Sequence, residues 1–189
     1  MLGHSFGAMV ALQHAVDHPG DAAATIVSNV VPSARYLVPH VQQNIAVFEP
    51  AELREQIVQA WASEASVVTS ADLEALWLKM MPFQFKDPFD RRMAQFMERG
   101  AGVVYAPDVV RHFATFPIEV EDRLPRITQP VLVIAGRHDR TCSLPAAQAV
   151  ADGIADAQLV ILEHSAHMTF VEENERFVAV ARDFLDRHL

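Results

Sequence analysis

The pentapeptide GHSFG at residues 3–7 constrains the fold of this chain more than any other stretch. A G-x-S-x-G sequence is typical of a sharp turn that joins a β-strand to an α-helix and exposes the central serine, here Ser5. The apolar run at residues 8–16 indicates that helix, and the HPG sequence at residues 18–20 ends it. Only Met1 and Leu2 precede the turn, so we expect a strand there of which little is present.

Short apolar runs alternate with helical patterns on either side of a long central segment. The runs at residues 24–31, 131–135 and 158–162 are rich in β-branched residues and nearly continuous, as buried parallel strands are. Helical patterns follow at residues 144–154 and 171–189. Strands that alternate with helices predict an α/β fold built on a parallel sheet.

The central segment has a different character. It predicts amphipathic helices at residues 52–62, 70–81 and 90–99, with Ser70 and Asp90 as helix starts, and no strand pattern interrupts them. We interpret it as a helical lid inserted into the core. The predicted division is therefore residues 1–32 for the turn, first helix and next strand, residues 33–125 for the lid, and residues 126–189 for the C-terminal core.

Three residues with catalytic chemistry lie where predicted strands end: Ser5, Asp139 and His167. Because the carboxyl ends of parallel strands meet at one edge of a sheet, we expect these side chains to lie close together. A serine hydroxyl is a poor nucleophile until a base such as His167 removes its proton, and Asp139 would orient and stabilise the imidazolium. The pattern predicts a serine nucleophile with Asp139 and His167 as its partners.

Other residues near the turn have expected roles. Gly3 and Gly7 are expected to be required, because a side chain at either would clash with the neighbouring strand or helix. The backbone N–H of Phe6 is expected to donate to the oxyanion of a tetrahedral intermediate, and His4 is expected to line the turn and contact substrate. Cys142 is the one cysteine and has no base assigned to it, so a nucleophilic role is not expected.

Composition excludes several partners. The net charge of −9 argues against nucleic acid and against anionic membrane surfaces, both of which select for an excess of lysine and arginine. No apolar run approaches the length of about 20 residues that crosses a bilayer, and no signal-peptide pattern is present. No histidine or acidic spacing suggests a metal site, and no cofactor is predicted. We expect a cytoplasmic protein whose partner is a small molecule or short peptide; the sequence leaves its oligomeric state open.

Taken together, these motifs resemble the α/β-hydrolase superfamily over the whole chain, in GHSFGA, VLVIAGRHD and EHSAHMTFVEENERF. The chain order serine, aspartate, histidine is also the one expected of that superfamily. Within it the chain looks most like the prolyl aminopeptidase (proline iminopeptidase) branch, which IVSNVVPSARYL and HMTFVEE resemble. The resemblance implies an α/β-hydrolase fold, a parallel sheet with a helical lid, in which the N-terminal half of the sheet is missing.

That branch removes an N-terminal proline and grips the free amino group with acidic side chains. One acid lies in the lid ahead of the catalytic aspartate, and Asp108 falls at that register. A second directly follows the aspartate, where this chain has Arg140. Its permanent charge would repel a protonated amine and would suit a carboxylate-bearing acyl group or a neutral ester better.

The lid aromatic and methionine side chains are expected mostly to form lid core, with some lining an apolar acyl pocket: Trp61, Trp77, Met80, Met81, Phe83, Phe85, Phe89, Phe96 and Phe113.

Three functional hypotheses follow from these residues. The first is a serine hydrolase that cleaves a small ester, amide or peptide bond through an acyl-enzyme; it requires neutral His167, so activity should rise through about pH 6–7. The second is a carboxylester, lactone or carbon–carbon bond hydrolase with the same three residues. The third is an inactive fragment or a ligand-binding pseudoenzyme.

The strands that precede the turn in the superfamily also carry the second oxyanion donor. Without them we expect an exposed apolar sheet edge, and either aggregation or a need for a partner segment. We also expect weak activity, because loss of one oxyanion donor costs roughly a hundred- to a thousandfold in rate.

Overall fold

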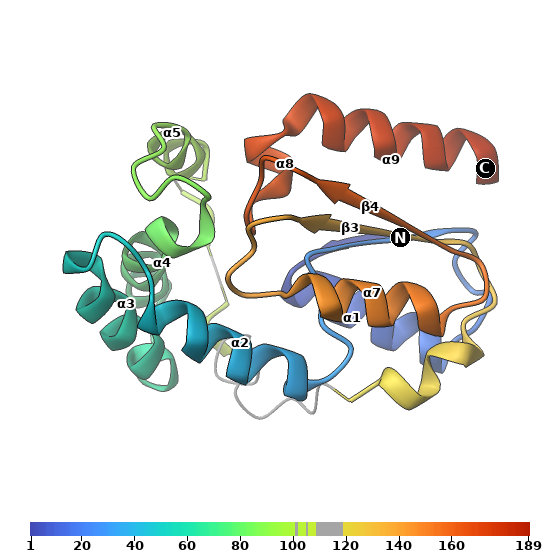
Figure 1. Cartoon of the computed structure of the whole chain (residues 1–189), viewed down its shortest axis with the longest axis horizontal. Helices are drawn as coiled ribbons and strands as arrows, with labels where there is room; N and C mark the ends of the chain where they lie inside the picture. The colour runs from blue at the N-terminus through green and yellow to red at the C-terminus, as the bar shows by residue number, and fades with distance from the viewer. Residues whose placement is uncertain (101, 105, 109–118) are drawn as a thin grey trace.

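A parallel sheet lies at the centre of the computed structural model, which describes residues 1–100, 102–104, 106–108 and 119–189. Its four strands follow chain order, and helices cover both faces (Figure 1). This arrangement confirms the predicted α/β class. The strands are β1 (Leu2–His4), β2 (Thr25–Ser28), β3 (Val131–Gly136) and β4 (Ala157–Leu162).

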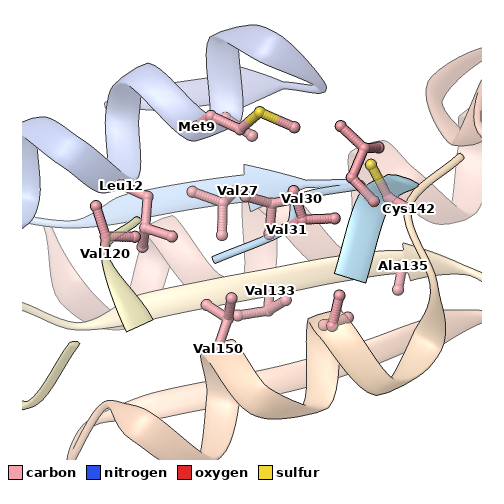
Figure 2. Close-up of a cluster of buried hydrophobic side chains, with 14 of the residues drawn as sticks. Met9, Leu12, Val27, Val30, Val31, Val120, Val133, Ala135, Cys142 and Val150 are labelled. Atoms are coloured by element: carbon pink, nitrogen blue, oxygen red, sulfur yellow. The ribbon is translucent and has the colours of Figure 1, made fainter. Parts of the chain in front are cut away.

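The sheet separates two apolar cores. Helices α1 (Phe6–Asp17) and α7 (Leu144–Gly153) cover one face, and α9 (Asn174–His188) covers the other (Figure 1). Alternate residues of β3 serve the two sides: Val133 packs in the first core and Leu132 in the second. Figure 2 shows the first core, in which Val27 and Val133 lie between helices α1 and α7. Burial on both faces explains why these strands are apolar at nearly every position.

Two element boundaries differ from the sequence prediction for local backbone reasons. The run predicted as a strand over residues 24–31 stops at Ser28, because Asn29 has a φ of 52° and leaves the extended region. The final helix predicted over residues 171–189 is divided into α8 (Thr169–Glu172) and α9, which Glu173 separates.

The lid helices group beyond the carboxyl ends of the strands (Figure 1). They are α2 (Ala34–Ala46), α3 (Glu52–Ser63), the 3₁₀ turn η1 (Glu64–Ser66), α4 (Ser70–Gln84) and α5 (Arg92–Arg99). The chain returns to the core through the 3₁₀ helix η2 (Glu121–Arg126). Helix α2, which contains Pro39, is not among the helices predicted from the sequence. Within the described ranges, no helix is both long and apolar enough to cross a membrane.

Side chains at the helix starts also differ in detail from the prediction. The N-cap of α4 is Thr69, not Ser70: the Thr69 hydroxyl accepts from the backbone N–H of Asp72, and the Asp72 carboxylate accepts from that of Thr69. Helix α5 begins at Arg92, whose backbone N–H donates to the carboxylate of Asp90 at 2.8 Å. In both α4 and α5, a side chain thus satisfies a backbone N–H at the start of the helix.

Arg140 ties the lid to the core. Its guanidinium donates to the backbone oxygens of Phe83 (3.2 Å), Phe85 (2.5 Å) and Lys86 (3.1 Å), at the end of α4 and just beyond it. Glu172 adds a second tie, because its carboxylate accepts from the backbone N–H of Lys86 at 2.8 Å. These bonds fix the end of the longest described lid helix against the edge of the sheet at which the strands end.

The substitution Arg140→Met should therefore loosen the lid. We expect it to lower the free energy of unfolding by about 1.5–3 kcal/mol, the usual worth of a hydrogen bond to a charged group, and to speed hydrogen exchange in α4. Arg137→Met is the matched control, because Arg137 makes an exposed ion pair with Glu163 and should change little. Denaturant titration and hydrogen-exchange mass spectrometry compare the two; equal effects would contradict a special role for Arg140.

Candidate active site

Ser5 occupies the sharp turn between β1 and α1. Its φ of 52° and ψ of −122° are unfavourable for a residue with a side chain. The turn is held by its own backbone: the Ser5 N–H donates to the carbonyl of Ser28 at 2.9 Å, and the Ser5 carbonyl accepts from Ala8 at 2.9 Å. The predicted strand–turn–helix arrangement around the serine is thus present.

The two glycines of the pentapeptide are not equivalent. A Cβ on Gly3 would lie 2.2 Å from the carbonyl oxygen of Gly7, so the crowding predicted there is confirmed. A Cβ on Gly7 would meet nothing within 4 Å among the described residues. The prediction that a side chain at residue 7 would clash is therefore wrong, because this position at the start of α1 faces open space.

Ser5, His167 and Asp139 form one hydrogen-bonded series. Nε2 of His167 lies 2.9 Å from Oγ of Ser5, and Nδ1 of His167 lies 2.9 Å from Oδ2 of Asp139. Asp139 and His167 are buried, and they come from the loops that follow β3 and β4. The structure thus brings together the three residues that the strand ends predicted.

The Asp139 carboxylate is surrounded by donors. Oδ1 accepts from the backbone N–H groups of Thr141 (2.7 Å) and Cys142 (2.9 Å), and Oδ2 accepts from Nδ2 of Asn29 (2.7 Å). Burial alone would raise the pKa of Asp139, but the charge of His167 and these hydrogen bonds outweigh it and lower the pKa below its usual value. Asp139 is therefore ionised at neutral pH.

Two adjacent carboxylates hold the loop that carries His167. Glu172 accepts from the backbone N–H of Ala166 at 2.7 Å, and Glu173 accepts from that of His164 at 2.8 Å. The loop also packs onto β3, where a Cβ on Gly136 would lie 1.9 Å from the carbonyl oxygen of Ala166. The sequence following His167 thus supplies the groups that position it.

His4 lies beside His167. Their ring centroids are 5.0 Å apart, and the His4 ring also contacts Phe170 edge-on at 4.8 Å. Burial, together with the charge of His167, lowers the pKa of His4 to about 3. His4 therefore stays neutral across the pH range in which the site would work.

A cavity of about 350 Å³ opens on Ser5. Its polar lining comes from Ser5, His4, His167, Gln84, Thr141 and Glu64. The rest of its wall is apolar and comes mainly from the lid and from the loop after His167: Leu37, Trp61, Leu76, Trp77, Met80, Met81, Phe96, Met168 and Phe170.

The other lid aromatics expected near the pocket lie elsewhere. Phe83 and Phe85 are fully buried and do not line the cavity, and Phe89 is 71% exposed. Phe113 lies outside the described residues. The mixture of lid core and pocket wall that the sequence predicts is therefore present, with the division drawn at different residues.

Two residues expected to bind substrate are not in the cavity wall. Asp108 is exposed and does not line it, and the Arg140 guanidinium is bound to the carbonyls at the end of α4. The carboxylate in the wall is Glu64, at the end of α3. The Glu64 carboxylate makes no hydrogen bond or ion pair with any described residue, and burial raises the pKa of Glu64 to about 7. Sequence reasoning missed Glu64, because nothing in its local pattern separates it from a surface glutamate.

One group of side chains has the composition of a metal site. Single ligand atoms of Asp139, Cys142 and His167 lie within 4.8 Å of one another. Burial and the charge of Asp139 raise the pKa of the Cys142 thiol well above its usual value, so the thiol stays protonated. Asp139 and His167 are bonded to each other, so the arrangement suits a proton relay better than a metal.

The sequence model of the α/β hydrolase family matches residues 1–180. This chain belongs to the α/β hydrolase family. A proline iminopeptidase of Saccharolobus solfataricus is 26% identical to this chain over 99% of the chain and 62% of that protein. The structure of a proline iminopeptidase from Mycobacterium smegmatis is 26% identical, with a TM-score of 0.68 over 99% of this chain and 64% of that one.

An esterase from Exiguobacterium antarcticum, at 19% identity and a TM-score of 0.68, shares the fold. These matches confirm the α/β-hydrolase fold and the resemblance to proline iminopeptidases. The chain spans less than two thirds of the length of the Saccharolobus and Mycobacterium proteins.

The contrast between the two glycines can be measured directly. Gly3→Ala should lower the free energy of unfolding by about 1–3 kcal/mol or more, because backbone must move to admit the methyl group. Gly7→Ala should leave stability unchanged or raise it by up to about 1 kcal/mol, since alanine is the better helix former. Thermal and denaturant unfolding test both, and a Gly7→Ala variant as unstable as Gly3→Ala would contradict the geometry.

Proposed function

We propose that this protein is a serine hydrolase that cleaves a small ester, amide or peptide bond through an acyl-enzyme. The observation that carries the proposal is the unbroken series from Ser5 Oγ through His167 to Asp139, with 2.9 Å at each step. Its exposed end faces a cavity large enough for a small acyl group. Similarity to the α/β hydrolase family supports the same reaction class.

Each residue would have one role. Nε2 of His167 would take the proton of Ser5 as Oγ attacks the scissile carbonyl, and would return it to the leaving group. Ionised Asp139 would stabilise the imidazolium and keep its tautomer. The developing oxyanion would accept from the backbone N–H of Phe6, in the first turn of α1, where the helix dipole also favours negative charge. A water molecule would then release the acyl group by the same route.

The cavity favours a substrate with an apolar residue and a free amino group. Its walls are mostly apolar, and Glu64 is the carboxylate among them that has no described partner. A protonated amine would supply that partner and would favour the ionised form of Glu64. Arg140, bound to backbone carbonyls, is not in the cavity wall to oppose such a group. Together with the proline iminopeptidase relatives, this supports an aminopeptidase that releases a small apolar N-terminal residue.

The apolar wall itself favours a second candidate, a carboxylester or lactone hydrolase with the same three residues. A neutral acyl ester needs no charged partner and would bind by burial of its chain alone. At low pH, protonated Glu64 would add little polarity to the cavity. The two candidates therefore differ in whether a substrate amine is needed.

Ser5→Ala should abolish covalent labelling of the 189-residue chain by a fluorophosphonate probe, because the probe reacts with an activated serine. Labelling needs a single turnover and so detects even slow enzymes. Ser66→Ala is the matched control, since Ser66 is an exposed serine of the lid and should leave labelling unchanged. A chain that is folded by circular dichroism but unlabelled, or a Ser5→Ala variant that is still labelled, would contradict the proposal.

Glu64→Gln should separate amine substrates from esters. For alanine or proline naphthylamides we expect KM to rise by about ten- to a hundredfold at pH 7.5, because a charge-assisted contact is lost. KM for a short acyl ester should change little. In the unmutated chain KM for the naphthylamides should fall as pH rises through about 7, where Glu64 ionises, until the substrate amine loses its proton near about pH 8.

Glu55→Gln, at an exposed glutamate on the preceding helix α3, controls for the change of charge. The pH dependence of the free energy of unfolding gives a second test of the raised pKa of Glu64. Because the fold raises the pKa of Glu64, the unmutated chain should lose stability as pH rises from about 4.5 through about 7, and Glu64→Gln should remove that loss. Identical KM values for free and N-acetylated naphthylamides would favour the esterase.

A further inference from the structure

Asn29 directly follows β2, the strand that lies between β1, which leads to Ser5, and β3, which leads to Asp139. Its side chain is buried, at 1% exposure, and its φ is 52°. Asparagine enters this left-handed region more readily than most residues, although at some cost. A buried polar residue with such a backbone needs strong contacts to hold it.

Every polar atom of the Asn29 carboxamide has a partner. Nδ2 donates to Oδ2 of Asp139 at 2.7 Å and to the carbonyl oxygen of Ala166 at 3.3 Å. Oδ1 accepts from the hydroxyls of Ser28 and Thr169, each at 2.9 Å. Carboxylate and carbonyl oxygens can only accept, so these partners determine which end of the amide carries the hydrogens.

The same NH₂ group therefore reaches two catalytic loops. Asp139 belongs to the loop after β3, and Ala166 immediately precedes His167 in the loop after β4. Oδ2 of Asp139 accepts from both Asn29 and Nδ1 of His167. Asn29 does not line the cavity, and its side-chain NH₂ group donates to Asp139 and Ala166 rather than to Ser5, so it would act through these two loops.

We propose that Asn29 is a positioning residue, whose NH₂ group aligns Oδ2 of Asp139 with Nδ1 of His167. The inference rests on the proposed function, because it gives Asn29 a part in activating Ser5. It gives a role to a residue to which the sequence patterns assign none. The hydroxyls of Ser28 and Thr169 complete the arrangement by holding the amide oxygen away from the Asp139 carboxylate.

Other titratable or charged groups also face Asp139 and must be considered in a pH experiment. His40 of α2 lies 3.0 Å from the Asp139 carbonyl oxygen, and His4 and Arg140 interact with its charge through space. Cys142 and His167 are its remaining neighbours. None of these is changed in the variants below, so differences among the variants report on Asn29.

The test compares Asn29→Gly and Asn29→Asp with Gln129→Ala. Glycine removes the amide without backbone strain, because it tolerates positive φ. Aspartate keeps the shape but adds a carboxylate beside Asp139. Gln129 is the matched control: it is also a buried carboxamide, bonded to the backbone N–H of Gly20 and to Thr25 near the start of β2, away from the catalytic loops.

We expect Asn29→Gly to slow fluorophosphonate labelling by roughly ten- to a hundredfold at neutral pH. When the labelling rate of this variant is plotted against pH, the rise on the acid side should move to higher pH. The reason is that Asp139, with one hydrogen-bond donor fewer, takes up protons more readily. Asn29→Asp should move this rise in labelling rate further toward high pH, since a second carboxylate raises the pKa of Asp139. Gln129→Ala should lower the free energy of unfolding without changing the pH dependence of the labelling rate.

A second readout does not need activity: the pH at which the His167 ring signals titrate by NMR should rise in Asn29→Gly and Asn29→Asp and not in Gln129→Ala. Labelling rates equal to that of the parent chain, with unchanged midpoints of the His167 titration in all three variants, would overturn the inference. A parent chain that is folded but not labelled would overturn only the proposed function. If Asn29→Gly does not fold, Asn29→Asp and Thr169→Val decide. Thr169→Val frees the amide to rotate and should slow labelling and move the midpoints in the same direction.

Discussion

The buried negative charge of Asp139 is the feature on which the rest of the site depends. An isolated carboxylate at this depth would take up a proton, because burial disfavours its charged form. Here it is held ionised by donors from three directions: the backbone of its own loop, Asn29 at the end of β2, and His167 after β4. These donors come from different strand ends, so the carboxylate can be both buried and ionised only when the sheet is correctly assembled.

Close backbone packing makes that assembly possible. Gly3 lets β1 approach α1, and Gly136 lets the loop before His167 pass directly over β3. A methyl group at either position would overlap a carbonyl oxygen. The strained φ of Ser5 belongs to the same closely packed region, where the strands end. Backbone segments approach one another there so closely that only glycine fits at residues 3 and 136.

Much of this could be predicted from the sequence, for physical reasons. Buried parallel strands are continuous apolar runs, so β3 and β4 were recognisable to within a residue. Ser5, Asp139 and His167 stood out as candidate site residues because they follow the ends of strands. The remainder depends on packing between distant segments. Asn29 reaches Asp139 only because β2 pairs with β3, and Glu64 lines the cavity only because the lid lies beyond the carboxyl ends of the strands. Gly7 was misjudged because a motif treats both of its glycines alike, although their surroundings differ.

The lid and the loops that carry Asp139 and His167 are parts of one hydrogen-bonded structure. The backbone N–H of His167 donates to the carbonyl of Gln84 at 3.0 Å, and the hydroxyl of Thr141, beside Asp139, donates to the Gln84 side chain at 3.0 Å. Gln84 ends α4, the helix whose methionines line the cavity. The wall that would contact the substrate and the base that would activate Ser5 are thus held by the same residue. A change in the lid that displaced Gln84 would therefore alter the geometry of His167 as well as the shape of the cavity, so substrate selection and nucleophile activation would not vary independently.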